Sequence, residues 1–217
     1  KELYAHWHPT TFRAQAIAAR SYALHERWRN RNKSFDMEAG QASQAYVGIT
    51  SNAKAREAVQ STAGLALTYD SRVFAAYYSS STGGTGQDAA IAFPNGADIP
   101  PLRGFDQGTW ETGTPHFRWG PITRDRDDLT KRIAAWGAAN WHAVAGLTSL
   151  SAITVTGSNS AGRPSGFRVA DARGQSYTLT AEQFRFACNY QPDTLPALPA
   201  GSALKSSHVT PTVAGTS

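Results

Sequence analysis

Residues 12–24 read FRAQAIAARSYAL, and this alanine-rich stretch decides the fold. Because most faces of such a helix carry small side chains, it can lie very close to its neighbours. Thr10 or Thr11 can cap its first turn by accepting an amide hydrogen. The basic residues at 27–33 suit the negative end of the helix dipole. We therefore predict a buried, central helix that begins at about Pro9.

Downstream, the pattern predicts an α+β fold, in which this helix packs on a mixed, mostly antiparallel sheet. Residues 85–123 form a long loop rich in Gly, Pro and aromatic residues, and a loop of this length is usually functional. The other expected elements are a helix from Ser51 that stops at Gly64, a hairpin over 65–79, a helix over 125–141, strand segments at 153–155, 167–169 and 177–179, and a short helix over 182–190.

The chain has 217 residues, of which 41% are hydrophobic, so it can bury a core without disulfides or metals. We expect a single domain over 1–217, closed by an irregular segment rich in Pro, Ser and Thr at 191–217. The chain begins at Lys1 without a signal peptide or initiator Met, which predicts a fragment truncated at its N-terminus. No apolar run approaches the roughly 18 residues that a membrane-spanning helix needs.

The net charge of +5 favours polyanionic partners, either nucleic acid or an anionic cell-wall polymer. However, charged residues make up only 17% of the chain and form no basic runs, so we expect no nucleic-acid binding. The single cysteine, Cys188, excludes an internal disulfide and a cysteine-rich zinc site. Its apolar surroundings predict a buried thiol.

Three features of the sequence could form a metal-binding or catalytic site. The pair His6 and His8 can share a metal, but no third ligand has suitable spacing, so ordinary surface histidines are the better interpretation. The serines at 79–81 precede Gly83-Gly84, but the Gly-x-Ser-x-Gly elbow of a nucleophile is missing. We expect their hydroxyls to satisfy backbone groups or to bind polar ligand atoms. The third feature is a lone carboxylate, Glu2, which gains meaning only from its neighbours in the chain.

The stretch 12–24 closely resembles the signature LKAQAIAARTYAL of the SpoIID/LytB domain family of peptidoglycan-remodelling proteins. Five further segments resemble family motifs in the same order: QAYVG at 44–48, AVQSTAGLALTY at 58–69, AYYSSSTGG at 76–84, PLRGFD at 101–106 and LKSSHVT at 204–210. Six ordered similarities across the chain are much stronger than any one of them.

The resemblance implies lytic cleavage of glycan strands by a catalytic Glu in an E-M-P segment. Here Glu2-Leu3-Tyr4 occupies that place, 12 positions before Ala14, so Glu2 is the expected acid and base, although Leu3-Tyr4 departs from the pattern. Leu3, Trp7 and the alanine-rich helix are expected to raise the pKa of Glu2. The resemblance also implies residues that line the groove: Gln15, Arg20, Tyr78, Ser80, Ser81, Arg103 and Asp106. For Arg20 two roles stay open, pairing with a lactyl carboxylate or bracing a structural group.

Some relatives carry a C-x-x-x-H-C zinc site, where this chain has Glu38, Ala42 and Ser43, and Thr82 stands where Cys often precedes Gly-Gly. We therefore expect no metal and no other cofactor. The expected partner is peptidoglycan, and the expected location is extracytoplasmic. In the alternative function the chain is a non-catalytic glycan-binding module that activates a wall amidase.

Overall fold

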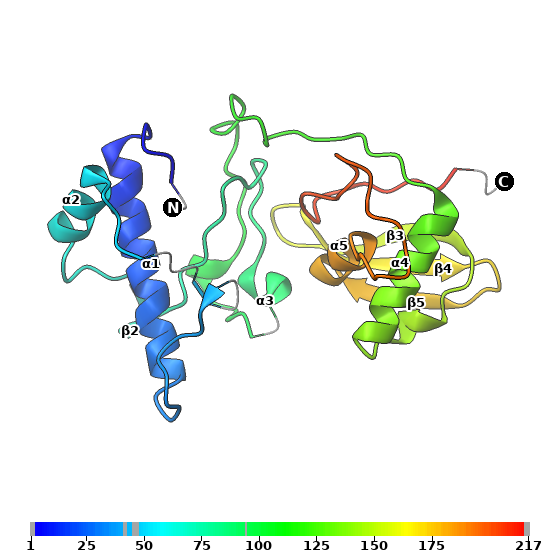
Figure 1. The fold of residues 1–217 in the computed structure, drawn as a ribbon, viewed down its shortest axis with the longest axis horizontal. Helices are drawn as coiled ribbons and strands as arrows, with labels where there is room; N and C mark the ends of the chain where they lie inside the picture. The colour runs from blue at the N-terminus through cyan, green and yellow to red at the C-terminus, as the bar shows by residue number, and fades with distance from the viewer. Residues whose placement is uncertain (1–2, 41–42, 45–47, 94, 215–217) are drawn as a thin grey trace. The chain divides into compact units, whose positions relative to one another are not determined.

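The computed structural model describes residues 3–40, 43–44, 48–93 and 95–214. The chain divides into two compact units, residues 1–79 and 80–217 (Figure 1). The described residues form α-helices and antiparallel sheets, one of two strands and one of three, which confirms the α+β class. That the chain is a single domain over 1–217 stays a prediction.

In the 1–79 unit, the alanine-rich stretch lies in the long helix α1 (Pro9–Arg29). Its N-cap is His8, whose Nδ1 accepts the Thr10 amide at 3.2 Å, so the expectation of a Thr10 or Thr11 cap is wrong. The cause is Pro9, which has no amide hydrogen and a backbone angle already suited to the first helical position. The helix therefore begins at Pro9, two residues before the start that a cap at Thr10 would give.

Helix α1 packs on α2 (Ala53–Ser61) and contacts the small hairpin of β1 (Thr68–Tyr69) and β2 (Arg72–Val73). Asn52 caps α2, and the two-residue turn of the hairpin has positive φ at both positions, as its tight type requires. Among the described side chains of α1, three are buried: Phe12, Ser21 and Glu26. Most other side chains of the helix are half-buried or exposed, which differs from the buried helix that we expected.

The 80–217 unit holds a three-stranded antiparallel sheet in the order β3-β4-β5, and all three expected strand segments lie within it. Helix α4 begins after the cap Asp125, and α5 begins with a capping box formed by Thr180 and Gln183. The bounds are β3 (Leu150–Ser158), β4 (Pro164–Asp171), β5 (Ser176–Thr180), α4 (Arg126–Ala139) and α5 (Ala181–Cys188).

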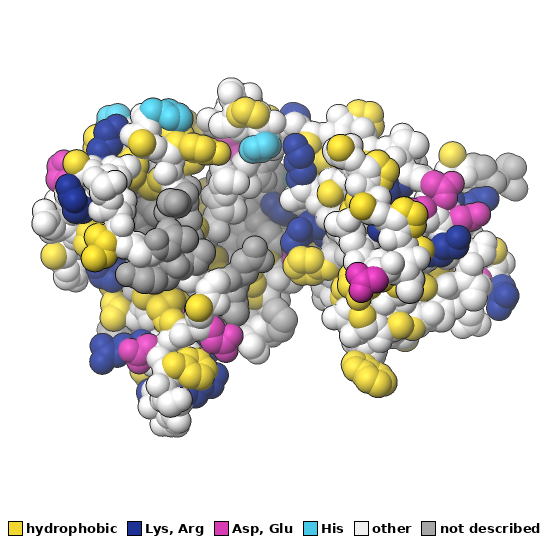
Figure 2. Space-filling model, in the orientation of Figure 1, with side chains coloured by type: hydrophobic (Ala, Val, Ile, Leu, Met, Phe, Trp, Pro, Cys, Tyr) yellow, Lys and Arg dark blue, Asp and Glu magenta, His cyan; other side chains and the backbone are white. Residues whose placement is uncertain are grey.

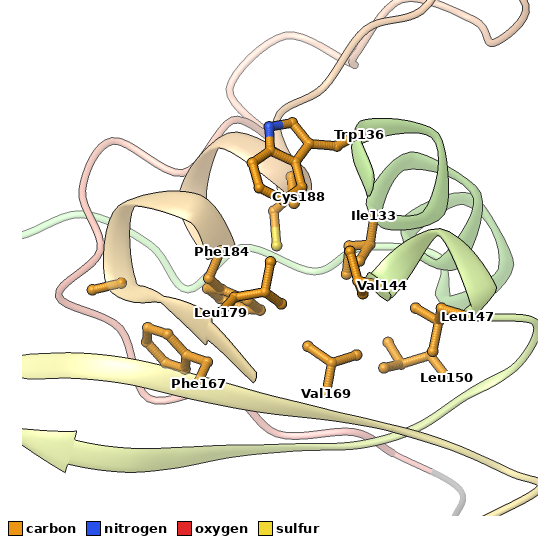
Figure 3. Close-up of a cluster of buried hydrophobic side chains, with 12 residues drawn as sticks. Ile133, Trp136, Val144, Leu147, Leu150, Phe167, Val169, Leu179, Phe184 and Cys188 are labelled. Carbon is orange, nitrogen blue, oxygen red and sulfur yellow. The ribbon is translucent and has the colours of Figure 1, made fainter. Parts of the chain in front are cut away.

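Helices α4 and α5 cover the sheet and enclose the hydrophobic core (Figure 3). The rings of Phe167 and Phe184 stack with their centroids 4.2 Å apart. Cys188 is buried in this cluster, and the burial raises the pKa of its thiol to about 12. The buried thiol that the sequence predicts is therefore confirmed.

Buried arginines fasten the closing segment to α4. The Arg132 side chain is 1% exposed and donates to Asp128, to the Tyr190 carbonyl at 2.9 Å and to the Pro196 carbonyl at 2.6 Å.

The long loop before α4 contains short helical turns. The turns before α4 are α3 (Ala89–Ala92) and η2 (Pro100–Leu102), and η3 (Ala143–Gly146) follows α4. None of the described helices combines the length and apolarity that crossing a membrane requires.

Candidate functional site

A pocket of about 670 Å³ lies beside the first turns of α1. Leu3, Phe12 and Gln15 line it on one side, and residues 50–55 line it on the other. Glu2, the expected catalytic residue, lies outside the described residues. Its neighbour in the chain, Leu3, and the expected groove residue Gln15 belong to the same lining.

Lys54 fastens the segment that leads into α1. Its Nζ donates to the carbonyl oxygens of Ala5 and Trp7, each at 3.1 Å. Because Lys54 belongs to α2, these two bonds tie the residues that come after Glu2 in the chain to the far wall of the pocket. The position of Lys54 in the first turn of a helix offered no sequence signal for this role.

The Arg20 guanidinium is directed to the end of α2. Nη1 donates to the carbonyl oxygens of Thr62 at 2.7 Å and Leu65 at 2.8 Å, and Nη2 donates to the Val59 carbonyl at 3.3 Å. The last carbonyls of a helix lack partners within the helix and carry partial negative charge. Arg20 therefore braces the contact of α1 with α2, and it does not line the pocket beside Gln15.

The signature helix also holds segments that come later in the sequence. The Ser21 hydroxyl donates to the Ile17 carbonyl and accepts the Leu67 amide at 2.8 Å. Gln44 donates to the Ala19 carbonyl at 3.2 Å and to the Tyr78 hydroxyl at 3.4 Å. The expected site residue Tyr78 is thus joined to α1 through Gln44, and its side chain stays partly exposed.

In the 80–217 unit, the turn after Ser80 encloses the carboxylate of Glu111. The hydroxyls of Ser81 and Thr82 donate to its oxygens, and so do the backbone amides of Thr82 at 3.0 Å and Gly83 at 3.3 Å. Burial opposes ionisation, but these hydrogen bonds outweigh it and hold the pKa of Glu111 below its ordinary value. Glu111 is therefore an ionised anchor for the turn at neutral pH.

A second pocket, of about 570 Å³, opens on this turn. Ser80 and Ser81 line it together with Phe117 and Trp119 from the long loop, and with Lys205 and His208 from the closing segment. Two of the segments that resemble family motifs, 76–84 and 204–210, therefore meet in one cavity although more than 100 residues separate them. Its lining holds the cationic side chains of Arg118, Arg185 and Lys205 and no carboxylate among the described residues.

Arg103 and Asp106 lie apart from both pockets. Arg103 pairs with Asp98 at 2.8 Å, where both side chains are more than half exposed. Asp106 accepts the Gly108 amide at 2.7 Å and stabilises a turn of the long loop. The structure does not bring these two predicted residues together with Gln15 or Ser81 in either lining.

At the described positions where some relatives carry zinc ligands, the side chains or backbone of this chain form hydrogen bonds instead. The Ser43 hydroxyl accepts the Glu38 amide and donates to Glu26, and Thr82 binds Glu111. Ala42 lies outside the described residues. Among those that the structure describes, no group of three or more His, Cys, Asp or Glu is arranged to hold a metal ion.

Sequence reasoning missed Glu111, which holds the turn at 81–83, and several residues of the pocket that opens on this turn. Glu111 stands in a Gly-rich and Thr-rich loop with no periodicity, so only the folded turn reveals its role. Lys205 and His208 lie in a segment whose resemblance to a family motif assigns them no function. Arg118 stands between Phe117 and Trp119 in the long loop. This placement of a cation between two aromatic residues was the one sequence signal for a binding role.

Residues 1–69 match the family model SpoIID, stage II sporulation protein. The resemblance recognised from the sequence is thereby confirmed over this part of the chain, which includes α1 and α2. No curated protein matches the chain. The matched model describes a sporulation protein, and the match covers about a third of this chain.

Proposed function

From the match of residues 1–69 to the SpoIID family model, we propose that the protein acts on the cell wall and cleaves the glycan strands of peptidoglycan by lytic transglycosylation. Glu2 is the proposed acid and base. The observation that carries the proposal is the pocket at the start of α1, in which Leu3, adjacent to Glu2 in the chain, and Gln15 share one lining. The proposed place of action is extracytoplasmic.

Lytic transglycosylation suits a site with a single carboxylate. Hydrolysis of a glycosidic bond generally takes two, an acid and a base or nucleophile. Here the C6 hydroxyl of N-acetylmuramic acid attacks its own anomeric carbon while the bond from that carbon to the next sugar breaks. Glu2 donates its proton to the departing oxygen and its carboxylate then accepts the C6 hydroxyl proton. The product is a 1,6-anhydro end, and the attacking group is already positioned within the substrate.

Other residues have supporting roles in this proposal. The Gln15 amide, half-buried in the lining, offers donors and an acceptor for an acetamido or hydroxyl group of the sugar. Arg20 contributes indirectly, because its hydrogen bonds to the end of α2 hold the two helices that form the pocket walls.

The test is Glu2→Gln, assayed by mass spectrometry of the products from purified peptidoglycan. General acid–base catalysis contributes about 10²–10⁴-fold, so the variant should release anhydro-muropeptides at least about 100-fold more slowly. The matched control is Glu57→Gln, which removes an exposed carboxylate of α2 paired with Arg13 at 3.5 Å and should keep the parental rate. An unchanged rate in Glu2→Gln would contradict the assignment.

The second candidate is a glycan-binding module that activates an amidase and performs no turnover. The pocket at Ser80 and Ser81 favours it, because its described lining offers aromatic and hydroxyl groups but no carboxylate to act as an acid. Sedimentation of the chain with purified glycan, without anhydro or reducing ends among the products, would support this function over the first one.

A further inference from the structure

The pocket of the 80–217 unit carries positive charge that the protein itself does not neutralise. Among the described residues, no carboxylate forms an ion pair with Arg118 or Lys205. Arg185 is paired with Glu182 at 2.7 Å. Figure 2 shows several Lys and Arg side chains close together on one face of the molecule. Arg118 and Lys205 are exposed and pair with no carboxylate of the described chain, so both cations are available to an anionic ligand.

A buried cation adds to this charge from behind the turn. Arg163 is 9% exposed, and its Nη1 donates to the carbonyl oxygens of Thr85 at 3.0 Å and Thr82 at 3.4 Å. Its Nε is buried and has no hydrogen-bond partner among the described residues. The acidic residues nearby are already occupied: Glu111 by the turn, and Glu182 by Arg185 and Ser207. Hydrogen bonds from these neutral groups leave the negative charge of Glu111 in place, but Arg118, Lys205 and Arg163, which form no ion pair among the described residues, outnumber it, so the net charge around the pocket stays positive.

The rest of the lining suits a sugar ring. Phe117 and Trp119 supply aromatic faces, on which the CH groups of a pyranose can stack. The hydroxyls of Ser80 and Ser206 supply donors and acceptors of the kind that sugar hydroxyls bind. The Arg118 guanidinium lies 4.8 Å from the centroid of the Phe117 ring, so a cation and an aromatic surface are held side by side.

We propose that this pocket binds an acidic sugar, with its carboxylate at Arg118 and Lys205 and its ring against Phe117 and Trp119. In peptidoglycan the acidic sugar is N-acetylmuramic acid, and the choice of that sugar rests on the proposed function. Its lining shares no residue with the pocket at the start of α1. The proposal assigns it binding of the sugar and no catalytic step.

The test uses the 217-residue chain with three probes: N-acetylmuramic acid, N-acetylglucosamine, which lacks the carboxylate, and inorganic phosphate. Calorimetry should show that N-acetylmuramic acid binds at least about 10-fold more tightly than N-acetylglucosamine, as one charge-assisted hydrogen bond implies. Arg118→Met and Lys205→Met should each weaken N-acetylmuramic acid about 10-fold. Lys131→Met, an exposed lysine of α4 outside the pocket, should bind like the parent chain.

The imidazole of His208 reports on the same pocket by NMR. Burial, together with Arg163 and Arg118, lowers the pKa of His208; Lys205, Arg185 and Glu182 are the other charged groups of its surroundings. A carboxylate bound beside it should raise that pKa, whereas N-acetylglucosamine should not. In the protein without ligand, Arg118→Met should also raise the pKa of His208, because one of the cations that lower it is gone. That shift would show that the variant is folded and has lost the charge at position 118.

Three results would overturn the inference: equal affinity for the two sugars, unchanged affinity in both pocket variants, or tighter binding of phosphate than of N-acetylmuramic acid. Its failure is distinguishable from that of the proposed function, because binding of a monosaccharide needs no turnover. A chain that binds N-acetylmuramic acid but releases no anhydro products supports the inference and contradicts the transglycosylase. A chain that releases anhydro products but fails the binding test supports the transglycosylase and contradicts the inference.

Discussion

Glu111 shows at the scale of a single residue how the turn at 81–83 is held. Its carboxylate accepts hydrogen bonds from two hydroxyls and two backbone amides, and a carboxylate can accept all of them because it has no hydrogen to donate. An amide in its place would aim an NH₂ group at donors. The ionised side chain is therefore required for the geometry of the turn.

Glu111→Gln should accordingly destabilise the 80–217 unit by about 2 kcal/mol, since hydrogen bonds to charged groups contribute about 1.5–3 kcal/mol. Chemical denaturation monitored by tryptophan fluorescence measures the loss. Asp193→Asn makes the same carboxylate-to-amide change at an exposed position and should alter the free energy of unfolding by less than about 0.5 kcal/mol. Equal stability of the two variants would show that the Glu111 hydrogen bonds contribute little.

At the scale of elements, the family-like signature of α1 serves largely to assemble its surroundings. Arg20, Ser21 and Ala19 each bond to a segment that lies more than 20 residues further along the chain. The sequence left open whether Arg20 reads a carboxylate or braces the protein, and its bonds to three carbonyl oxygens favour the brace. Sequence alone could not choose, because the free carbonyls exist only once α2 has ended beside α1.

Arg20→Met should therefore lower the stability of the α1–α2 contact by about 2 kcal/mol, seen as faster amide hydrogen exchange in α2 and at 62–67. Arg13→Met is the matched control on the same helix, because its pair with Glu57 is exposed and contributes well under 1 kcal/mol. If Arg20→Met kept its exchange protection and instead lost affinity for glycan, the residue would be a ligand contact and the bracing role would be wrong.

At the scale of the whole molecule, four groups of the 80–217 unit make stability depend on pH in one direction. Hydrogen bonds hold the pKa of Asp128, chiefly from Arg132, and of Asp171, chiefly from the Thr148 amide, below 3.8. Hydrogen bonds to Glu111 outweigh its burial and lower its pKa as well. Burial lowers the pKa of His208 below 6.5. All four bind protons more readily in the unfolded chain.

Acidification should therefore destabilise this unit in two stages. The contribution of His208 is complete above pH 6.5 and decreases as the pH falls below that value. The contributions of the three carboxylates are complete above about pH 4.5 and are lost as the pH falls through their lowered pKa values. Thermal unfolding from about pH 8 to about pH 3 measures both stages, and His208→Gln should remove only the first. A melting temperature that stays constant over this range would contradict this account.

The sequence by itself determined the α+β class, the main helices, the three strands of the larger sheet and the resemblance of its first part to the SpoIID family, which the family model matches over residues 1–69. These arise from local signals: caps, hydrophobic periodicity, turn residues and a contiguous motif. Even here one local detail was predicted wrongly: because Pro9 takes the first helical position, the cap of α1 is His8 and not a threonine.

Only the tertiary structure decided which distant side chains share a pocket. It joined the serines after position 79 to the segment 204–210, separated Arg103 and Asp106 from both linings, and placed the Glu111 carboxylate under the turn. A pocket is formed by loops whose paths depend on the packing of the elements between them, so spacing along the chain cannot reveal it. The burial and unpaired charge that define the cationic pocket exist only after that packing is complete.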